Sequence, residues 1–421
     1  MRTRDPTTLT SDELIPLVED ARWFAAKGRA LESAEVVGVP VREGLVALAI
    51  VEVRFAAGTH EHYLLALGED DDPVDAFERP EVAAQLAALA GVPAAGARIR
   101  SFGVEQSNSC VVLDELHVLK LYRRLEAGPN PELEILRVLG EARFGNAPRL
   151  EGALETHGPP LGTALASVTA LVPAVGGGWE LALDSLGDDP SWLPDRVWRL
   201  GEITAELHAA LASHPDPAFS PEEPSAESLG LLTAAIDEEI ATTFSTLPEG
   251  DALGAVAHRV EDIRDLVQEL SGAGPSGLSI RMHGDFHLGQ VIWAAGGDWV
   301  VIDFEGEPAR SLPERRRKRS PLRDLAGMTR SFAYAADASV LLNGVEPPAG
   351  WVDACRGGFV DGYLSAADER LLPPSRSGFD RLLALFELEK LVYELRYETR
   401  NRPEWASIPL VGLLRLLETT A

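Results

Sequence analysis

The sequence has only two cysteines in 421 residues, Cys110 and Cys355. They lie far apart and lack the paired spacing of a metal site, so neither a disulfide framework nor a cysteine-based zinc site is indicated. A chain that needs no disulfides suits a reducing compartment. We therefore expect a cytoplasmic protein.

Long apolar runs and an excess of basic charge are also absent. GLVALAIVEV is far shorter than the roughly 18 residues of a membrane-spanning helix, and MRTRDPTTLTSDELIPL lacks the apolar core of a signal peptide. The chain has 38 Lys and Arg against 66 Asp and Glu, a formal net charge of −28. Because no apolar run is long enough, we expect no membrane partner. The acidity repels phosphate backbones, so we also expect no nucleic acid partner, although a local basic pocket can still hold a nucleotide.

What is present is an ordinary globular composition, with 45% hydrophobic and 25% charged residues, on a chain long enough for two or three domains. A helix is predicted at TSDELIPLVEDARWFAAKGR and a second one at DDPVDAFERPEVAAQLAALAG. Between them, alternating apolar residues predict three antiparallel strands at EVVGVPV, GLVALAIVEVRF and HEHYLLAL. Residues 1–93 therefore form a candidate small α+β domain of their own.

A second group of strands follows in ARIRSFGVEQ, SCVVLDE, HVLKLYRRL and ASVTALVPAV, with a helix at PELEILRVLGE. Residues 94–178 form this segment, and the triplet Gly176, Gly177 and Gly178 is typical of a hinge or linker. Residues 179–421 are mainly helical, and short strands are predicted only at LSIRMHG, QVIW and WVVIDFE.

The motif RMHGDFHLGQVIW and the later DFE carry the chemistry. Phosphoryl transfer needs a carboxylate near the attacking hydroxyl and oxygen ligands that hold magnesium against the nucleotide phosphates. Protein kinases divide these tasks between the Asp and Asn of H-R-D-x-x-x-x-N and the Asp of D-F-G. Here Asp285, a spacing-matched Gln290 and Asp303 offer the same groups in the same order.

The upstream half has the counterpart of the kinase lysine–glutamate pair. Lys120 lies on a predicted strand, and Glu134 lies on the helix that follows. Such a pair orients the α- and β-phosphates of ATP. These kinase-like residues occur in the correct order along the chain, which is much stronger evidence than any one of them alone.

These residues resemble the aminoglycoside phosphotransferase-like branch of the protein-kinase-like fold, and more closely the actinobacterial maltokinase and glucosamine kinase family. The matching stretches include RWFAAKGR, NPELE, PAVGGGWELAL, HGDFHLGQVIW, ERRRKRSPLRDLAGM and YETRNRPEW, which span nearly the whole chain. The resemblance implies an α+β, bilobal kinase fold with an N-terminal cap subdomain and a mainly helical C-terminal lobe. It also implies ATP, Mg²⁺ and a small sugar as phosphate acceptor.

The resemblance also implies roles for single residues. Asp285 resembles the catalytic base, Gln290 and Asp303 the magnesium ligands, and Lys120 with Glu134 the phosphate-orienting pair. Residues 171–175 resemble the nucleotide-binding hinge, with Val172 and Val175 as its contacts.

Two departures from the kinase pattern affect the nucleotide site. The phosphate loop lacks G-x-G-x-x-G and offers EQSNSC, so Ser107 and Ser109 with backbone N–H groups would cover the phosphates. Glu132 is an alternative to Glu134 as the partner of Lys120, because the helix phase is uncertain by two residues.

Other polar residues near these motifs have structural interpretations. His283 and His287 are expected to brace the loop by hydrogen bonding rather than to bind metal. Asp324 is expected to cap the helix that follows it. The basic run at 315–319 is expected to brace an acidic site electrostatically rather than to bind nucleic acid.

The acceptor candidates lie in ELEKLVYELRYETRNRPEW. Glu387, Glu394 and Glu398 fall near one stripe of a helix, and Trp405 follows the break at Pro403. An aromatic ring beside carboxylates is a suitable sugar platform, because the ring covers an apolar sugar face while carboxylates accept hydrogen bonds. Glu398, Trp405, Glu394 and Arg402 are the predicted acceptor contacts.

The leading function is therefore an ATP-dependent sugar kinase. A carboxylate-rich acceptor site favours glucosamine, giving glucosamine 6-phosphate, over maltose, giving maltose 1-phosphate. A non-catalytic kinase-like partner protein and an aminoglycoside-modifying enzyme are further alternatives. The sequence leaves the oligomeric state open and is compatible with a monomer.

Overall fold

The computed structural model describes residues 5–24, 26–68, 73–102, 108–225, 227–245, 258–274 and 276–420. The chain folds into two compact units. One comprises Met1–Gly140, Pro148–Val172 and Pro308–Glu314, and the other comprises Glu141–Ala147, Pro173–Glu307 and Arg315–Ala421.

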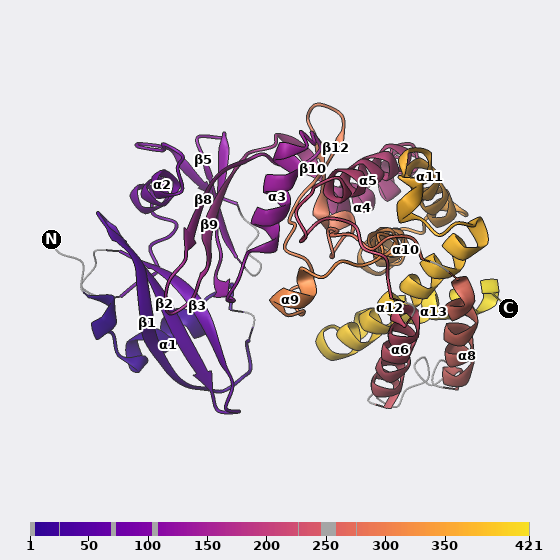
Figure 1. Cartoon of the computed structure of the whole chain (residues 1–421), viewed down its shortest axis with the longest axis horizontal. Helices are drawn as coiled ribbons and strands as arrows, with labels where there is room; N and C mark the ends of the chain where they lie inside the picture. Colours follow the sequence, from indigo (N-terminus) through magenta and orange to yellow (C-terminus); the bar gives the residue numbers. More distant parts are fainter. Residues whose placement is uncertain are drawn as a thin grey trace. The chain divides into compact units, whose positions relative to one another are not determined.

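The first unit begins with an antiparallel sheet that has a helix on each side (Figure 1). Its strands are β1 (Leu31–Glu43), β2 (Val46–Phe55), β3 (His60–Leu67) and β7 (Arg124–Leu125), in the order β1-β2-β3-β7, preceded by η1 (Pro6–Thr8). Alternate residues of β2 face opposite sides. Val51 packs in the core that includes Leu14 of α1 (Ser11–Glu19), whereas Ile50 packs in the core that includes Leu86 of α2 (Pro80–Leu89).

Both predicted helices of this region are shorter than their sequence patterns. The first ends at Glu19, and the chain then turns so that Trp23 and Phe24 enter the core beside Tyr63. The second begins at Pro80, because proline fixes a φ angle suited to the first helical turn and needs no N–H partner there.

A second antiparallel sheet follows within the same unit. Its order is β4 (Ile99–Ser101), β5 (Ser109–Leu113), β6 (His117–Leu121), β9 (Thr163–Ala170) and β8 (Leu150–Thr156). The helix α3 (Pro131–Glu141) covers the segment PELEILRVLGE, which was predicted to be helical. Leu119 of this sheet shares one hydrophobic core with Leu48 of the first sheet. Through this shared core, residues 1–93, the expected cap subdomain, pack against the strands that follow within one compact unit.

The second unit is mainly helical, with one small antiparallel sheet. Its strands are β10 (Ala174–Gly177), β11 (Val291–Ala294) and β12 (Trp299–Val301). LSIRMHG, expected as a strand, forms only isolated bridges. The glycine triplet is not a linker, because Gly178 begins α4 (Gly178–Asp188), where an added Cβ would lie 2.7 Å from the carbonyl oxygen of Leu288.

Long helices form the body of this unit (Figure 1). α10 (Leu322–Asn343) packs against α11 (Trp351–Ala366), α12 (Arg376–Asn401) and α13 (Ser407–Thr420). The remaining helices described in the chain are α5 (Val197–Ala212), α6 (Ser228–Ser245), α8 (Val260–Leu270), α9 (Leu312–Arg315), η2 (Ser271–Ala273), η3 (Leu288–Gln290), η4 (Glu369–Leu371) and η5 (Pro403–Trp405). Within the described ranges, no helix has the length and apolarity that crossing a membrane requires.

Candidate active site

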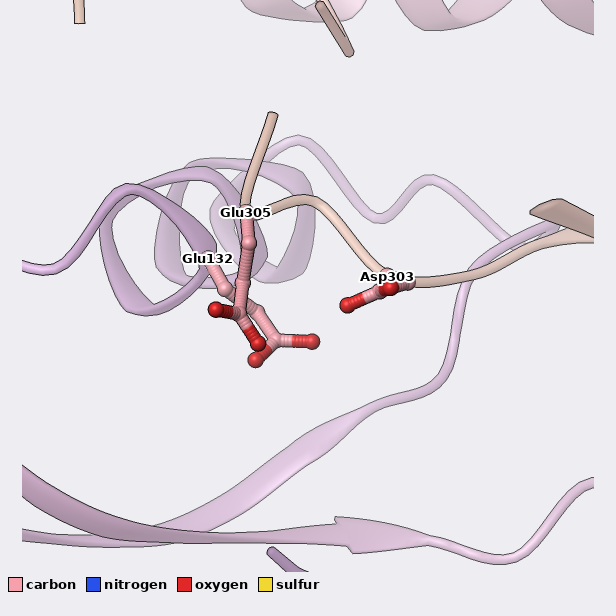
Figure 2. A group of neighbouring side chains, drawn as sticks. All are labelled: Glu132, Asp303 and Glu305. Atoms are coloured by element: carbon pink, nitrogen blue, oxygen red, sulfur yellow. The ribbon is translucent and has the colours of Figure 1, made fainter. Parts of the chain in front are cut away.

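Lys120 in the first unit forms an ion pair with α3. Its ammonium nitrogen lies 3.0 Å from a carboxylate oxygen of Glu132, and both side chains are largely buried. Tyr122 donates a hydrogen bond of 2.8 Å to the same carboxylate. Figure 2 shows Glu132 projecting from the start of α3. The tyrosine and the helix together fix the carboxylate, which in turn fixes the lysine.

The partner of Lys120 is thus Glu132, the alternative left open by the sequence, and the expected pairing with Glu134 is corrected. Two residues along an α-helix correspond to a rotation of about 200°, so the two carboxylates leave the helix on different sides. The sequence PELE offers a glutamate at either position of the helix, and only tertiary packing shows which one faces Lys120. A nucleotide contact by Glu134 is not supported by this pairing.

The remaining predicted nucleotide contacts have different outcomes. Ser107 lies outside the described residues. Ser109 is 2% exposed, and its hydroxyl accepts a hydrogen bond of 2.8 Å from Arg123. The position paired with Lys120 is Cys110, so Ser109 belongs to the other face of the sheet, which disagrees with a phosphate contact. Val172 ends the first unit, so the boundary between the units falls inside the predicted hinge.

In the second unit, Asp285 lies on a loop that His283 braces from within. The His283 ring donates from Nε2 to the carbonyl oxygen of Ile302 at 2.9 Å, and its Nδ1 accepts the backbone N–H of Asp285 at 3.3 Å. A carbonyl can only accept and an N–H can only donate, so the ring carries its proton on Nε2. The expected bracing role of His283 is confirmed.

Asp324 holds the same loop from α10. Its two carboxylate oxygens accept the backbone N–H groups of His283 and Gly284, each at 2.9 Å. Burial raises the pKa of the Asp324 carboxyl, but hydrogen bonding and charge from His208 outweigh it and hold the pKa below its ordinary value. Asp324 is structural, as expected, but it anchors the loop rather than capping its own helix. The sequence signal was its place in SPLRD.

A glycine allows α10 to reach this loop. A Cβ added at Gly327 would lie 2.4 Å from the carbonyl oxygen of Phe286, far inside normal contact distance. The close approach places Asp324, three residues earlier on the same helix, directly against the loop backbone.

The Asp285 carboxylate faces two nitrogen groups without a hydrogen bond to either. Lys390 Nζ lies 3.8 Å from Oδ1, and His287 Nε2 lies 3.9 Å from Oδ2. Among the described residues, no donor lies within hydrogen-bonding distance of these oxygens. His287 also accepts the backbone N–H of Gly289 at 3.0 Å, as expected for a bracing role. The carboxylate is therefore placed to accept a hydrogen bond from a bound hydroxyl.

Lys390 was not among the predicted site residues. Its ammonium bonds to Glu307 at 3.1 Å. Burial lowers the pKa of Lys390, but the charges of Glu307, Asp285 and Glu394 outweigh burial and raise the pKa above its ordinary value. The stretch ELEKLVYELRYE places Lys390 and Arg396 among four acids, which was the signal available in the sequence.

Strand pairing in the second unit brings the two predicted magnesium ligands close together. The backbone N–H of Ile302, next to Asp303, donates to the carbonyl oxygen of Gln290 at 3.0 Å. Asp303 has a φ of 61°, a left-handed conformation that is uncommon for a residue other than glycine and that is found at functional sites. Carboxylate and amide oxygens are the donor set that magnesium prefers.

Glu305 adds a further carboxylate to this segment. Figure 2 shows Asp303 and Glu305 on the chain that follows β12, and their carboxylate oxygens lie within 4.8 Å of each other. The sequence reasoning used DFE only for its aspartate and missed this residue. Its signal was an acid at the position where D-F-G has glycine.

The predicted acceptor residues Glu398, Arg402 and Trp405 gather around Tyr334. Glu398 is 2% exposed and accepts hydrogen bonds from Tyr334 at 2.7 Å and from Arg402 Nη2 at 2.6 Å. The Trp405 ring stacks on Tyr334 with centroids 5.9 Å apart, and the Arg402 guanidinium lies 4.8 Å from the Trp405 ring centre. Trp179 of α4 packs against the same tyrosine.

Glu394 lies one turn before Glu398 and pairs with Arg330 of α10 at 2.9 Å. Glu387, earlier on the helix, accepts a hydrogen bond from Thr329. The predicted stripe on α12 is therefore confirmed, and it faces α10. Both predicted acceptor carboxylates are balanced by arginines, Glu394 by Arg330 and Glu398 by Arg402.

One face of α12 runs from Lys390, which lies beside the predicted base Asp285, to the predicted acceptor residues. Lys390, Glu394 and Glu398 are spaced by four residues, so they follow one another along the helix with a rise of about 6 Å each.

The chain matches known proteins along most of its length. Residues 96–343 match the phosphotransferase enzyme family, and residues 18–94 match the maltokinase N-terminal cap domain. A glucosamine kinase of Streptacidiphilus jiangxiensis is 30% identical over 378 residues, 86% of this chain and 81% of that protein. A glucosamine kinase of Mycolicibacterium smegmatis is 30% identical over 330 residues, 76% of this chain and 79% of that protein.

A solved structure agrees with these matches. A glucosamine kinase in complex with glucosamine, ADP and inorganic phosphate has a TM-score of 0.72 at 25% identity, covering 92% of this chain and 95% of that one. The expected α+β protein-kinase-like fold with an N-terminal cap is thereby confirmed.

Proposed function

The chain belongs to the phosphotransferase enzyme family, and from that premise we propose that it transfers the γ-phosphate of ATP to glucosamine, giving glucosamine 6-phosphate. The observation that carries the proposal is the placement of the Asp285 carboxylate. His283 and Asp324 hold its loop so that this carboxylate remains available to a hydroxyl. Substitution of Asp285 would therefore abolish phosphoryl transfer while leaving the protein folded.

In the proposed reaction, Asp285 orients the acceptor hydroxyl and accepts its proton. The hydroxyl oxygen forms a bond to the γ-phosphorus while the bond from that phosphorus to the β–γ bridging oxygen breaks, and ADP leaves. Lys120, held by Glu132, orients the α- and β-phosphates. The electrostatic contribution of such positioned groups is the main source of rate in phosphoryl transfer.

Magnesium would be held by Asp303 and Gln290, whose oxygens suit the ion. When bound, it would neutralise charge on the phosphates. The left-handed backbone at Asp303 supports this assignment because strained conformations persist where function requires them.

The amino sugar is favoured by the likeness to glucosamine kinases over most of the chain. The sequence argument from a carboxylate-rich acceptor site gives less support to the amino sugar, because Glu394 and Glu398 each pair with an arginine. Maltose is the second candidate, supported by the cap domain that matches maltokinases. Trp405 and Tyr334 offer aromatic faces to either sugar.

A coupled assay of ADP release across glucosamine, glucose, maltose and kanamycin tests the proposal. We expect the highest kcat/KM with glucosamine. A preference for maltose would assign the second candidate, and a preference for kanamycin would place the chain among aminoglycoside-modifying enzymes. If no acceptor stimulates ADP release and Mg-ATP causes no thermal shift, a non-catalytic partner protein replaces the kinase.

A further inference from the structure

Lys390 lies between two carboxylates of the second unit and is bound unequally to them. Its ammonium is 3.1 Å from Glu307 Oε1, a hydrogen bond, and 3.8 Å from Asp285 Oδ1, beyond hydrogen-bonding distance. The lysine side chain is 23% exposed and packs over the ring of Tyr393. The cation is therefore fixed by Glu307 and acts on Asp285 through its charge.

The chain surrounds Asp285 with further charge. The ammonium of Lys390 lies within 4 Å of both Glu307 and Asp285, and the charge of Glu394, itself paired with Arg330, also raises the pKa of the lysine. A carboxylate in such company is repelled by its neighbours unless a cation stands between them. Lys390 is the cation that occupies this position among the described residues.

We propose that Lys390 is a positioning residue for the Asp285 carboxylate, and that Glu307 holds the lysine at a distance which leaves Asp285 available to the acceptor hydroxyl. The inference rests on the proposed function only in taking Asp285 as the proton acceptor. Lys390 and Glu307 act through Asp285 and need no contact with the sugar.

The two residues make different contributions. Without Lys390, the Asp285 and Glu307 carboxylates lose the ammonium that lies between them, and repulsion turns the Asp285 carboxylate away from the hydroxyl. Without Glu307, the ammonium moves onto Asp285 and forms a close ion pair. Such an ion pair competes with the hydroxyl for the same oxygen.

A purely structural function would leave a different signature. Lys390 connects α12 to the segment after Asp303, so it also fixes local packing. If packing were its only effect, substitution would lower the melting temperature and would affect ATP binding, acceptor binding and turnover together. A positioning role instead lowers kcat with little change in either KM.

Three variants separate these effects: Lys390→Met, Glu307→Gln and the double variant. We expect Lys390→Met to lower kcat about 10-fold or more, with KM for Mg-ATP changed less than about 2-fold. Glu307→Gln should lower kcat as well. Because Glu307 acts through Lys390, the double variant should be no slower than Lys390→Met, a strong departure from additivity.

Arg396→Met is the matched control on the same helix. Arg396 pairs with Glu239 of α6 at 2.7 Å, so this variant also removes a cation from a carboxylate, but away from Asp285. We expect its kcat to match that of the wild type. Multiplicative losses in the double variant, or unchanged kcat in Lys390→Met, would overturn the proposal.

Lys390→Arg guards against a folding defect. It keeps the positive charge, and at equal melting temperature it should retain more kcat than Lys390→Met. Equal losses in the two variants would contradict the inference. Asp285→Asn distinguishes this inference from the proposed function: if it abolishes turnover while Lys390→Met does not, only the role of Lys390 fails. If Asp285→Asn is fully active, the base assignment fails first.

Discussion

Asp324 and Gly284, 40 residues apart in the chain, are joined by a hydrogen bond of 2.9 Å from the glycine backbone N–H to the carboxylate. The second oxygen of the same carboxylate accepts the N–H of His283. His208 contacts this oxygen at 3.1 Å and is itself bonded to the Tyr363 hydroxyl. The loop that carries Asp285 is thus held by the buried, ionised Asp324 of α10 in addition to the His283 ring within the loop.

Asp324→Asn is expected to destabilise the fold by roughly 2–4 kcal/mol at neutral pH, because an amide can accept only one of the two backbone bonds and loses the charge. The pKa of Asp324 is lowered in the folded state, so its stabilisation is present above the unfolded pKa, about 3.9, and is lost as the pH falls through the folded pKa. Urea unfolding of both proteins should therefore show a gap that narrows in acid.

Asp337 on the same helix is a control, because its pKa is shifted in the direction opposite to that of Asp324. Burial raises the pKa of the Asp337 carboxyl, so its ionisation costs stability as the pH rises above the unfolded value. Asp337→Asn should be at least as stable as the wild type at neutral pH. A gap for Asp324→Asn that widens in acid would contradict the anchor role.

Asp285→Asn is expected to lower phosphoryl transfer by about 10²-fold or more while preserving the fold and Mg-ATP binding. The amide keeps the shape of the side chain but cannot accept the proton. Turnover is measured by ADP release and nucleotide binding by calorimetry. Asp298→Asn, in the turn between β11 and β12, is the matched control and should retain full activity. Near-normal turnover of Asp285→Asn would remove this residue from the mechanism.

The α12 stripe was predictable because the spacing of Glu387, Glu394 and Glu398 is a local property of one helix. The order of Lys120, Asp285, Gln290 and Asp303 was likewise readable from motifs. These predictions need no knowledge of how distant segments pack.

Other features depend on tertiary packing and were not predictable. PELE fits a lysine partner in either phase, and only the contact with Tyr122 selects Glu132. Ser109 shares its strand with Cys110, but the face of each residue follows from pairing with β6. β8 was missed because its residues are all partly exposed and lack a strong alternation. Lys390 was missed because α12 alone does not reveal Glu307.

Glu132→Gln is expected to raise KM for Mg-ATP about 10-fold, because Lys120 loses the charge that fixes it. KM for the sugar should change little. Glu134→Gln on the same helix is the matched control and should leave KM for Mg-ATP within about 2-fold. Steady-state kinetics with varied Mg-ATP decide between them. A larger effect of Glu134→Gln would restore the original assignment of the pair.

Trp405→Ala and Glu398→Gln are expected to weaken acceptor binding, each raising KM for the sugar about 10-fold with KM for Mg-ATP unchanged. Trp405→Ala removes the ring stacked on Tyr334, and Glu398→Gln removes the charge that holds Arg402. Since Glu398 is buried beneath Tyr334 and Arg402, its effect reaches the sugar through them. A stacked aromatic platform typically contributes about 0.5–1.5 kcal/mol beyond its area, and loss of the buried surface adds to that.

Trp198→Ala is the matched control for the tryptophan, because Trp198 is 46% exposed on α5 and hydrogen-bonded to Glu202. It should leave both KM values unchanged. Calorimetry of sugar binding to Trp405→Ala and Glu398→Gln separates affinity from turnover. If both variants keep their sugar affinity while their ATP affinity falls, the acceptor site does not lie along this face of α12. The Trp405 ring and the Glu398 carboxylate both contact Tyr334, so a sugar bound beside Tyr334 would be affected by at least one of the two substitutions.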